Sequence, residues 1–466
     1  MVAARPGLGA LLCFGVLAAL GCGKSGGAKD ASAPPVVVPP LADAGGADVP
    51  ASADAGVDSS VDAVLPSDVR IPCQAGALTC IGRNPATCDA DGGWVAAPTC
   101  SADAGGCSAG VCGTPAMIAA GGTHTCALRD DGTVRCWGDN TIGQLGFTGA
   151  PTVPAPTMPV PLSAKAVQIS AFGLHACAAL ETGTVACWGE NGAGQLGAGD
   201  KAVHTMPVGP SDLLGILDVA TGADHTCVRR VLGLVECWGA NDRGQLGADV
   251  PDAGLDHQRL SFYMQEYEPW VLAVAAGDQR TAAITTGGDV YAWGLVDSTL
   301  RAGSAWQVRV NGAAVAIAAG GNQGCAVLDH GQLECWGSTT GSVNDSELDK
   351  AEPVPLPGRA VAVAVGRAFT CVVLETGELS CWGDNYAGQL GLGDTTDRNT
   401  PSAPFSVGGR ALAVTAGYRH TCVRLDTGAV KCWGDNSAGQ LGLGDRRNRG
   451  GTADTVPAKL PEIAFP

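Results

Sequence analysis

Residues 124–146 read HTCALRDDGTVRCWGDNTIGQLG, and this stretch decides the fold because the chain repeats its pattern. Two short runs rich in strand-forming residues flank an Asp-Asp-Gly turn, which predicts two strands joined by a tight hairpin. The turn glycine supplies the positive φ that such a hairpin needs. Upstream, copies carry a Val/Ala run such as residues 361–365, which suits a buried strand.

The Trp-Gly pair that ends the hairpin recurs at intervals of 43 to 55 residues, with a glycine always five residues before the tryptophan. The tryptophans are Trp137, Trp188, Trp238, Trp293, Trp336, Trp382 and Trp433. A period of about 50 residues indicates a propeller or solenoid. A Pro-x-x-Val/Leu segment usually precedes the Val/Ala run, giving about four strands per copy, the content of a propeller blade. The sequence therefore predicts an all-β, seven-bladed β-propeller over residues 116–466.

Cysteines stand one and eleven residues before the tryptophan in six copies, and the remaining copy has Ala282 and Ala292 at both positions. Residues ten apart face each other across a hairpin that folds at its midpoint. The two cysteines of a copy are either both present or both absent. This favours six disulfides within blades over free packed thiols. The predicted pairs are Cys126–Cys136, Cys177–Cys187, Cys227–Cys237, Cys325–Cys335, Cys371–Cys381 and Cys422–Cys432.

Five copies continue after the tryptophan as Asn-x-x-Gly-Gln-Leu-Gly, first at residues 140–146. This pattern resembles the repeat of the regulator of chromosome condensation family, and the resemblance implies a seven-bladed β-propeller. Kelch and WD40 propellers have comparable periods, but the Gly-Gln-Leu-Gly tail argues against both. The family's eukaryotic founder exchanges nucleotide on a nuclear GTPase while docked on chromatin. A net charge of −17 argues against binding to nucleic acid. Together with the export expected below, it leads us to expect no small GTPase partner.

The chain ends also bear on ring closure. The first copy begins at Met117 without a preceding Pro-x-x-Leu segment, whereas such a segment, Val456–Leu460, has no copy after it. We therefore expect the C-terminal segment to pair into the first blade as a closing strand, which would remove an exposed sheet edge.

The N-terminal region predicts export. Arg5 precedes an apolar run that ends in Ala19-Leu20-Gly21-Cys22, which resembles a bacterial lipobox. Residues 1–22 are thus expected to be a lipoprotein signal with Cys22 lipidated; the alternative is an ordinary cleaved signal. Residues 23–72 hold seven Asp and no aromatic residue, which predicts a disordered tether. We expect an exported bacterial lipoprotein of the cell envelope, in the outer membrane or at the cell surface.

Residues 73–115 form a separate Cys-rich module. In an exported chain its six cysteines predict three disulfides, and the sequence leaves all 15 connectivities open. They are Cys73, Cys80, Cys88, Cys100, Cys107 and Cys112. No Cys-x-x-Cys pair and no nearby His accompany them, which disfavours zinc.

Binding is the expected class of function. Four of the seven histidines share one repeat position, which favours a structural role, and no catalytic or nucleotide motif occurs. We expect no enzyme activity, no catalytic residues, no metal and no cofactor. Phe262, Tyr263 and Tyr267 form an aromatic cluster that either anchors a partner or covers an outer strand.

We therefore expect a membrane-anchored extracytoplasmic binding or scaffold protein that contacts an unknown exported protein through a propeller face. One alternative is an inhibitor that caps the active site of an exported β-lactamase or cell-wall enzyme. Secreted β-lactamase inhibitor proteins have a similar propeller. A weaker option is a carbohydrate-binding or hydrolytic role.

Overall fold

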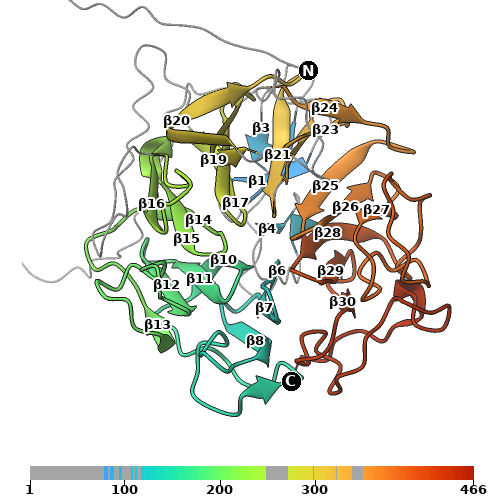
Figure 1. The fold of residues 1–466 in the computed structure, drawn as a ribbon, viewed down its shortest axis with the longest axis horizontal. Helices are drawn as coiled ribbons and strands as arrows, with labels where there is room; N and C mark the ends of the chain where they lie inside the picture. The colour runs from blue at the N-terminus through green and yellow to red at the C-terminus, as the bar shows by residue number, and fades with distance from the viewer. Residues whose placement is uncertain are drawn as a thin grey trace, which may run out of the picture. The chain divides into compact units, whose positions relative to one another are not determined.

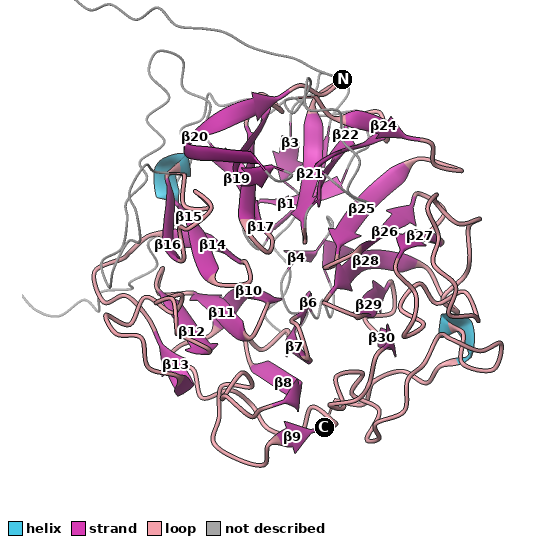
Figure 2. Cartoon of the chain, viewed as in Figure 1, coloured by secondary structure: helices cyan, strands magenta, loops and turns pink. Residues whose placement is uncertain are grey.

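The computed structural model describes ten stretches of the chain. They are residues 78–81, 84–88, 94–96, 107–108, 111–112, 117–247, 271–296, 299–321, 323–337 and 350–465. From residue 117 onward the chain forms a seven-bladed β-propeller whose inner strands surround a common axis (Figure 1). Helical structure in the described residues is limited to two short 3-10 turns, η2 (Val231–Gly233) and η3 (Pro457–Lys459) (Figure 2).

The blades, numbered here in chain order, are antiparallel meanders. Blade 1 contains β6 (Met117–Ala120), β7 (His124–Leu128), β8 (Val134–Asp139) and β9 (Thr152–Val153). Blade 2 contains β10 (Ala166–Phe172), β11 (His175–Leu180), β12 (Val185–Gly189) and β13 (His204–Val208). Blade 3 contains β14 (Ile216–Thr221), β15 (His225–Arg230) and β16 (Val235–Gly239).

The remaining blades follow the same order. Blade 4 contains β17 (Val271–Ala276), β18 (Arg280–Thr285), β19 (Val290–Val296) and β20 (Thr299–Val308). Blade 5 contains β21 (Ala314–Ala319), β22 (Gln323–Leu328), β23 (Leu333–Gly337) and β24 (Glu352–Val354). Blade 6 contains β25 (Ala360–Val365), β26 (Phe369–Leu374) and β27 (Leu379–Gly383). Blade 7 contains β28 (Ala411–Ala416), β29 (His420–Leu425) and β30 (Val430–Gly434).

The Cys-rich module has its own small sheets. Its three-stranded sheet consists of β1 (Leu78–Ile81), β2 (Asn84–Cys88) and β3 (Trp94–Ala96). A second ladder pairs β4 (Cys107–Ser108) with β5 (Val111–Cys112).

The repeat tryptophans form the core between blades. Trp188 of blade 2 belongs to the apolar cluster that contains Leu128 and Leu145 of blade 1. Trp433 likewise joins the cluster of blade 6, and Trp137 joins the cluster of blade 7. Each of these indoles is fully buried. Because every blade inserts its largest side chain into the preceding blade, burial of apolar area joins neighbouring blades around the ring.

The ring closes in a different way from the one predicted. The Pro-containing segments are outer strands of the preceding blade, because each follows its own Trp-Gly and pairs with the strand that carries it. Accordingly, the Ile463 amide donates to the Val430 carbonyl of blade 7, at 2.9 Å, and does not pair into blade 1. The predicted first-blade pairing of the C-terminal segment is therefore wrong.

Side chains at the C-terminal end nevertheless reach blade 1. The Phe465 ring lies edge-on to Trp137 with 5.8 Å between centroids, and Ile463 packs in the same cluster. The C-terminus accordingly lies beside β8 and β9 (Figure 2). Each blade is thus built from consecutive chain, and the seam between blades 7 and 1 is held by side-chain packing and hydrogen bonds.

Candidate functional site

The blade hairpin is cross-linked at its centre in six blades. The Cα atoms of the paired cysteines lie 4.0–4.2 Å apart, and all six disulfides are those expected from the ten-residue spacing. The strand register places the two cysteines directly opposite, as for Cys177 and Cys187. Six disulfides in one domain indicate an oxidising, extracytoplasmic type of environment.

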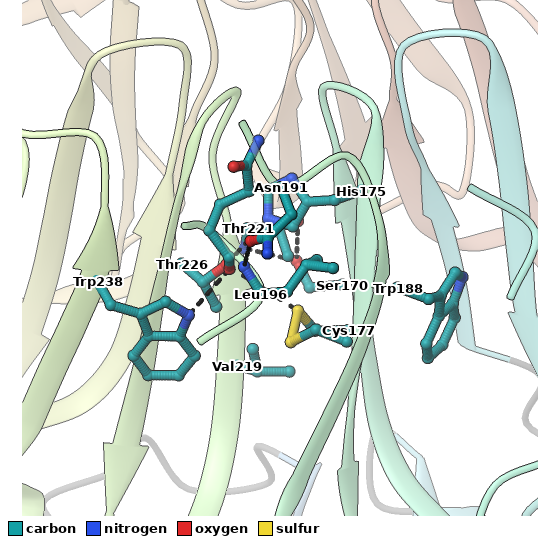
Figure 3. Close-up of a disulfide and its surroundings, with 12 residues drawn as sticks. Ser170, His175, Cys177, Trp188, Asn191, Leu196, Val219, Thr221, Thr226 and Trp238 are labelled. Atoms are coloured by element: carbon teal, nitrogen blue, oxygen red, sulfur yellow. Dashed lines mark hydrogen bonds between the residues drawn. A yellow bond between two sulfur atoms is a disulfide. The ribbon is translucent and has the colours of Figure 1, made fainter. Parts of the chain in front are cut away.

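A polar network that recurs at several blade interfaces joins blades 2 and 3 (Figure 3). Between blades 2 and 3, Nε2 of His175 lies 2.9 Å from the Thr226 hydroxyl. That hydroxyl donates to the Gln195 carbonyl at 2.8 Å, and the Trp238 indole N–H donates to the same oxygen at 2.9 Å. The Gln195 carbonyl is thus an acceptor for two groups of the following blade.

The same arrangement recurs at other interfaces. His225 and His420 bond to the hydroxyls of Thr281 and Thr125, each at 2.9 Å. In blade 5 the position of the histidine is taken by Gln323, whose Oε1 accepts from the Thr370 hydroxyl at 2.9 Å. A glutamine that replaces histidine and still bonds to the threonine, as acceptor where the histidine donates, indicates that this repeat position is structural, as the sequence predicted.

The Gly-Gln-Leu-Gly segment is a loop fixed by its own side chains. Oδ1 of Asn191 accepts from the Leu196 amide at 2.9 Å, and Oε1 of Gln195 accepts from the Ala193 amide at 3.0 Å. A Cβ added at Gly197 would lie 3.0 Å from Nε1 of Trp238, so only glycine lets the indole approach. The motif therefore positions the carbonyl that receives the next blade's tryptophan.

Some interfaces depart from this pattern, since blade 2 has Ala176 and blade 5 has Gly324 in place of the threonine, and blade 6 has Phe369 in place of the histidine. At the interface between blades 1 and 2, His124 is fully buried. Neither ring nitrogen of His124 has a hydrogen-bond partner among the described residues. Burial lowers its pKa to about 3, and the nearby His420 adds to this effect. The imidazole is therefore neutral at physiological pH.

Side chains from four blades cross the axis at the end where the inner strands finish. Phe172 of blade 2 lies edge-on to Tyr418 of blade 7, with ring centroids 5.5 Å apart. The Arg367 guanidinium of blade 6 stacks on Tyr418 at 5.0 Å, and its Nε lies 3.5 Å from the Asp278 carboxylate of blade 4. Phe172, which stands where other copies have glycine, thus contributes to an aromatic and ionic bridge across the axis.

Carboxylates gather around this bridge, and we call Glu190, Asp224 and Asp278 with Arg367 and Tyr418 the axial acidic cluster. Burial, followed by repulsion from Asp224, raises the pKa of Glu190. Burial and the Asp242 carboxylate raise the pKa of Asp224, and burial raises that of Asp278 although Arg367 opposes it. Because the one guanidinium partners Asp278, the cluster keeps an excess of negative charge for its interaction with solvent or a ligand.

Several predicted site residues cannot be placed. The aromatic cluster Phe262, Tyr263 and Tyr267 and the proposed lipid site Cys22 lie outside the described residues, and the cysteine connectivity of the 73–115 module stays open. The described residues contain no group of His, Cys, Asp or Glu suited to a metal ion. They also contain no helix with the length and hydropathy of a bilayer-spanning segment.

The axial acidic cluster was not predicted from the sequence. Asp278, Arg367 and Tyr418 share one repeat position, directly after the repeat glycine, but they come from different blades and differ in side chain, so they form no recognisable motif. Two signals were available in the sequence: this variable position after the glycine, and Phe172, which breaks a glycine position that the other copies keep.

Comparison with known proteins supports the repeat family that the Trp-Gly and Gly-Gln-Leu-Gly pattern resembles. The family model "Regulator of chromosome condensation (RCC1) repeat" matches six segments, and a second model of that description matches residues 182–229 and 376–424. The six segments are residues 118–144, 166–195, 216–245, 271–297, 360–389 and 412–440.

Relatives and solved structures agree with these matches. The ultraviolet-B receptor UVR8 of Arabidopsis thaliana is 30% identical over 357 residues, which cover 72% of this chain and 80% of the receptor. The human E3 ubiquitin-protein ligase HERC2 is 28% identical over 237 residues but is matched over only 5% of its length. Human WBSCR16 superposes with a TM-score of 0.61 at 21% identity, covering 71% of this chain and 93% of that chain.

Prp20p of Saccharomyces cerevisiae superposes with a TM-score of 0.56 at 20% identity, covering 74% of this chain and 88% of that chain. Propellers of this type are typically non-catalytic scaffolds for protein–protein interaction. Both the repeat matches and the coverage of the plant receptor lead to one conclusion: the chain belongs to the regulator of chromosome condensation (RCC1) repeat family.

Proposed function

We propose that this protein is a membrane-anchored extracytoplasmic scaffold that binds another exported protein through the propeller face carrying the axial acidic cluster. The grouping of Glu190, Asp224 and Asp278 is the observation that carries the proposal. Carboxylates whose pKa values are raised by burial and mutual repulsion gain when a cation approaches. The partner surface that fits this face is basic, with Lys or Arg side chains directed at the axis.

The same face offers an aromatic contact. Tyr386 is 52% exposed, and the Arg419 guanidinium stacks on its ring at 4.9 Å. Tyrosine and arginine are enriched at the centres of protein interfaces, because they combine a large contact area with polar groups. Disulfide-linked blades hold these residues on a rigid frame, so little conformational entropy is lost when a partner binds.

Capture from intact cell envelopes tests this function. The tagged full-length chain and a Glu190→Gln/Asp224→Asn variant are incubated with solubilised envelopes, and captured proteins are quantified by mass spectrometry. We expect the variant to lose the basic partner, and the wild-type capture to weaken as salt rises, because screening reduces charge attraction. A Glu375→Gln/Asp426→Asn variant is the matched control, since both residues are exposed in hairpin turns remote from the cluster. Equal capture by both variants would contradict the proposal.

The aromatic cluster at 262–267 is tested in the same assay. Replacing Phe262, Tyr263 and Tyr267 by Ser should reduce capture if they anchor the partner, while unchanged capture removes them from the interface. Activity assays on the captured protein separate scaffold from inhibitor. Loss of β-lactamase or cell-wall enzyme activity upon capture would favour inhibition, whereas retained activity favours a scaffold.

A further inference from the structure

The inner strands share a β-bulge that turns one aliphatic side chain outward. In blade 2 the register passes from Ala166 to Gln168, which leaves Val167 unpaired. The same shift recurs in blades 3 to 7. We call the six bulge residues the bulge ring: Val167, Leu217, Leu272, Val315, Val361 and Leu412.

The bulge ring is unusually exposed for aliphatic residues. Val315 is 63% exposed, Val361 50% and Leu217 46%. Five of the twelve exposed large hydrophobic residues in the described chain belong to the ring, and Leu214 and Val231 lie beside it in blade 3. Apolar side chains that gather at one end of a domain indicate an interaction surface, because leaving them in water forgoes their burial energy.

The chain itself identifies the occupant. β6, which starts at Met117, is the inner strand of blade 1, and Met117 is 37% exposed at the strand's start. Only residues 113–116 separate Met117 from Cys112, the last residue of β5 in the Cys-rich module. Five Cα–Cα steps span at most about 19 Å. The module therefore cannot move far from the bulge ring.

We propose that the Cys-rich module, residues 73–112, docks on the bulge ring and covers that end of the propeller axis. A module of this size has too little interior to bury much apolar surface and relies on cross-links, so an external apolar surface adds to its stability. Docking removes the exposed aliphatic side chains from water and leaves the acidic end for a partner. The inference does not depend on the identity of any partner.

Hydroxyl-radical footprinting of the oxidised full-length chain tests this docking. Leu217 and Leu272 should oxidise several-fold more slowly than expected from their intrinsic reactivity and exposure, while Met206, 44% exposed on β13, should react at its normal rate. In a Val315→Asp/Val361→Asp variant, Leu217 and Leu272 should become reactive. Val203→Asp is the matched control, because Val203 is 47% exposed and lies outside the ring.

The outcomes are distinct. Unprotected ring leucines in the wild-type chain would overturn the proposal, as would protection that survives in the double variant. Protection that rises with protein concentration, together with a doubled mass, would assign the surface to a second copy of the chain and also overturn it. The thermal unfolding midpoint of each variant verifies folding, since the replaced side chains are largely exposed.

Discussion

Blades 3 and 4 are neighbours with the same hairpin and different means of holding it. In blade 3 the disulfide Cys227–Cys237 joins the centre of the hairpin, with Cα atoms 4.0 Å apart. In blade 4 the equivalent residues are Ala282 and Ala292, which pair in the same register and are equally buried. The strand register is therefore specified by hydrogen bonds and packing, and the disulfide adds stability to a structure that forms without it.

Blade 4 has a compensating feature. Its outer strand β20 spans ten residues, and Trp306 on this strand stands opposite Ala292. The half-buried indole packs against the apolar cluster that contains Ala282 and Ala292. A large aromatic residue on a long outer strand thus packs against the one blade hairpin that lacks a cross-link, and the contribution of each feature can be tested by substitution.

Removing the cross-link from blade 3 should cause the largest change in stability. A Cys227→Ala/Cys237→Ala variant is expected to lose about 3 kcal/mol of unfolding free energy, because the unfolded chain regains the freedom of a ten-residue loop. Denaturant unfolding under non-reducing conditions measures the loss. A loss well below 1 kcal/mol would show that blade 3 needs its disulfide no more than blade 4 does.

Adding the cross-link to blade 4 is the converse test. An Ala282→Cys/Ala292→Cys variant should form a seventh blade disulfide and gain about 2 kcal/mol, somewhat less than a native bond because the neighbouring Trp306 must accommodate the sulfur atoms. Peptide mapping without reductant identifies the bond. Two free thiols in the folded variant would contradict the equivalence of the two hairpins.

Acidification should weaken the bond between these two blades. Burial lowers the pKa of His225 to about 4, whereas an unfolded histidine titrates near its ordinary value of 6.5. The unfolded chain therefore binds the extra proton first, and stability falls as pH drops from 6.5 towards 4, by up to about 1.4 kcal/mol per pH unit for this residue.

Between pH 6.5 and 5.5, a His225→Gln variant should lose about 1 kcal/mol less unfolding free energy than the wild type. Its glutamine can keep a hydrogen bond to threonine, as Gln323 does. Burial raises the pKa of Asp218 to about 6, so this residue stabilises the folded chain as the pH falls. Because the wild type and the variant both contain Asp218, its contribution cancels in the comparison. Identical pH dependence of unfolding in the two proteins would exclude His225 as a contributor.

The smallest effect is expected from restoring a threonine at the interface between blades 1 and 2. Blade 3 presents Thr226 to His175, whereas blade 2 presents Ala176 to His124. An Ala176→Thr variant should gain about 1 kcal/mol by giving His124 and the Gln144 carbonyl the hydroxyl found elsewhere. Ala176→Val, which adds similar volume without a hydroxyl, is the matched control and should show no such gain in thermal stability.

The repeat made most of the propeller predictable. Seven Trp-Gly pairs fixed the number of blades, and the ten-residue cysteine spacing fixed the disulfide partners, because both signals are local and recur with one register. Where a segment lies between two copies, sequence alone cannot say which copy it joins. The Pro-x-x-Val segments and the C-terminal segment were therefore assigned to the wrong blade, although their strand character in several blades was foreseen.

The interaction surfaces were less accessible to prediction. Asp278, Arg367 and Tyr418 meet only because the ring brings blades 4, 6 and 7 to one axis. The bulge residues read as interior strand positions, since a Val/Ala run does not reveal which residue a bulge turns outward. Both features arise from the closed three-dimensional arrangement, which no single repeat contains.

The order of cysteines along the propeller has a consequence for biosynthesis. Every blade disulfide joins two cysteines that are consecutive in the chain and ten residues apart. An oxidant that couples thiols in the order in which they emerge from a translocation channel would produce the native pairs directly. The propeller can thus be oxidised one blade at a time without rearrangement of its disulfides, and each completed hairpin is cross-linked before the next one appears.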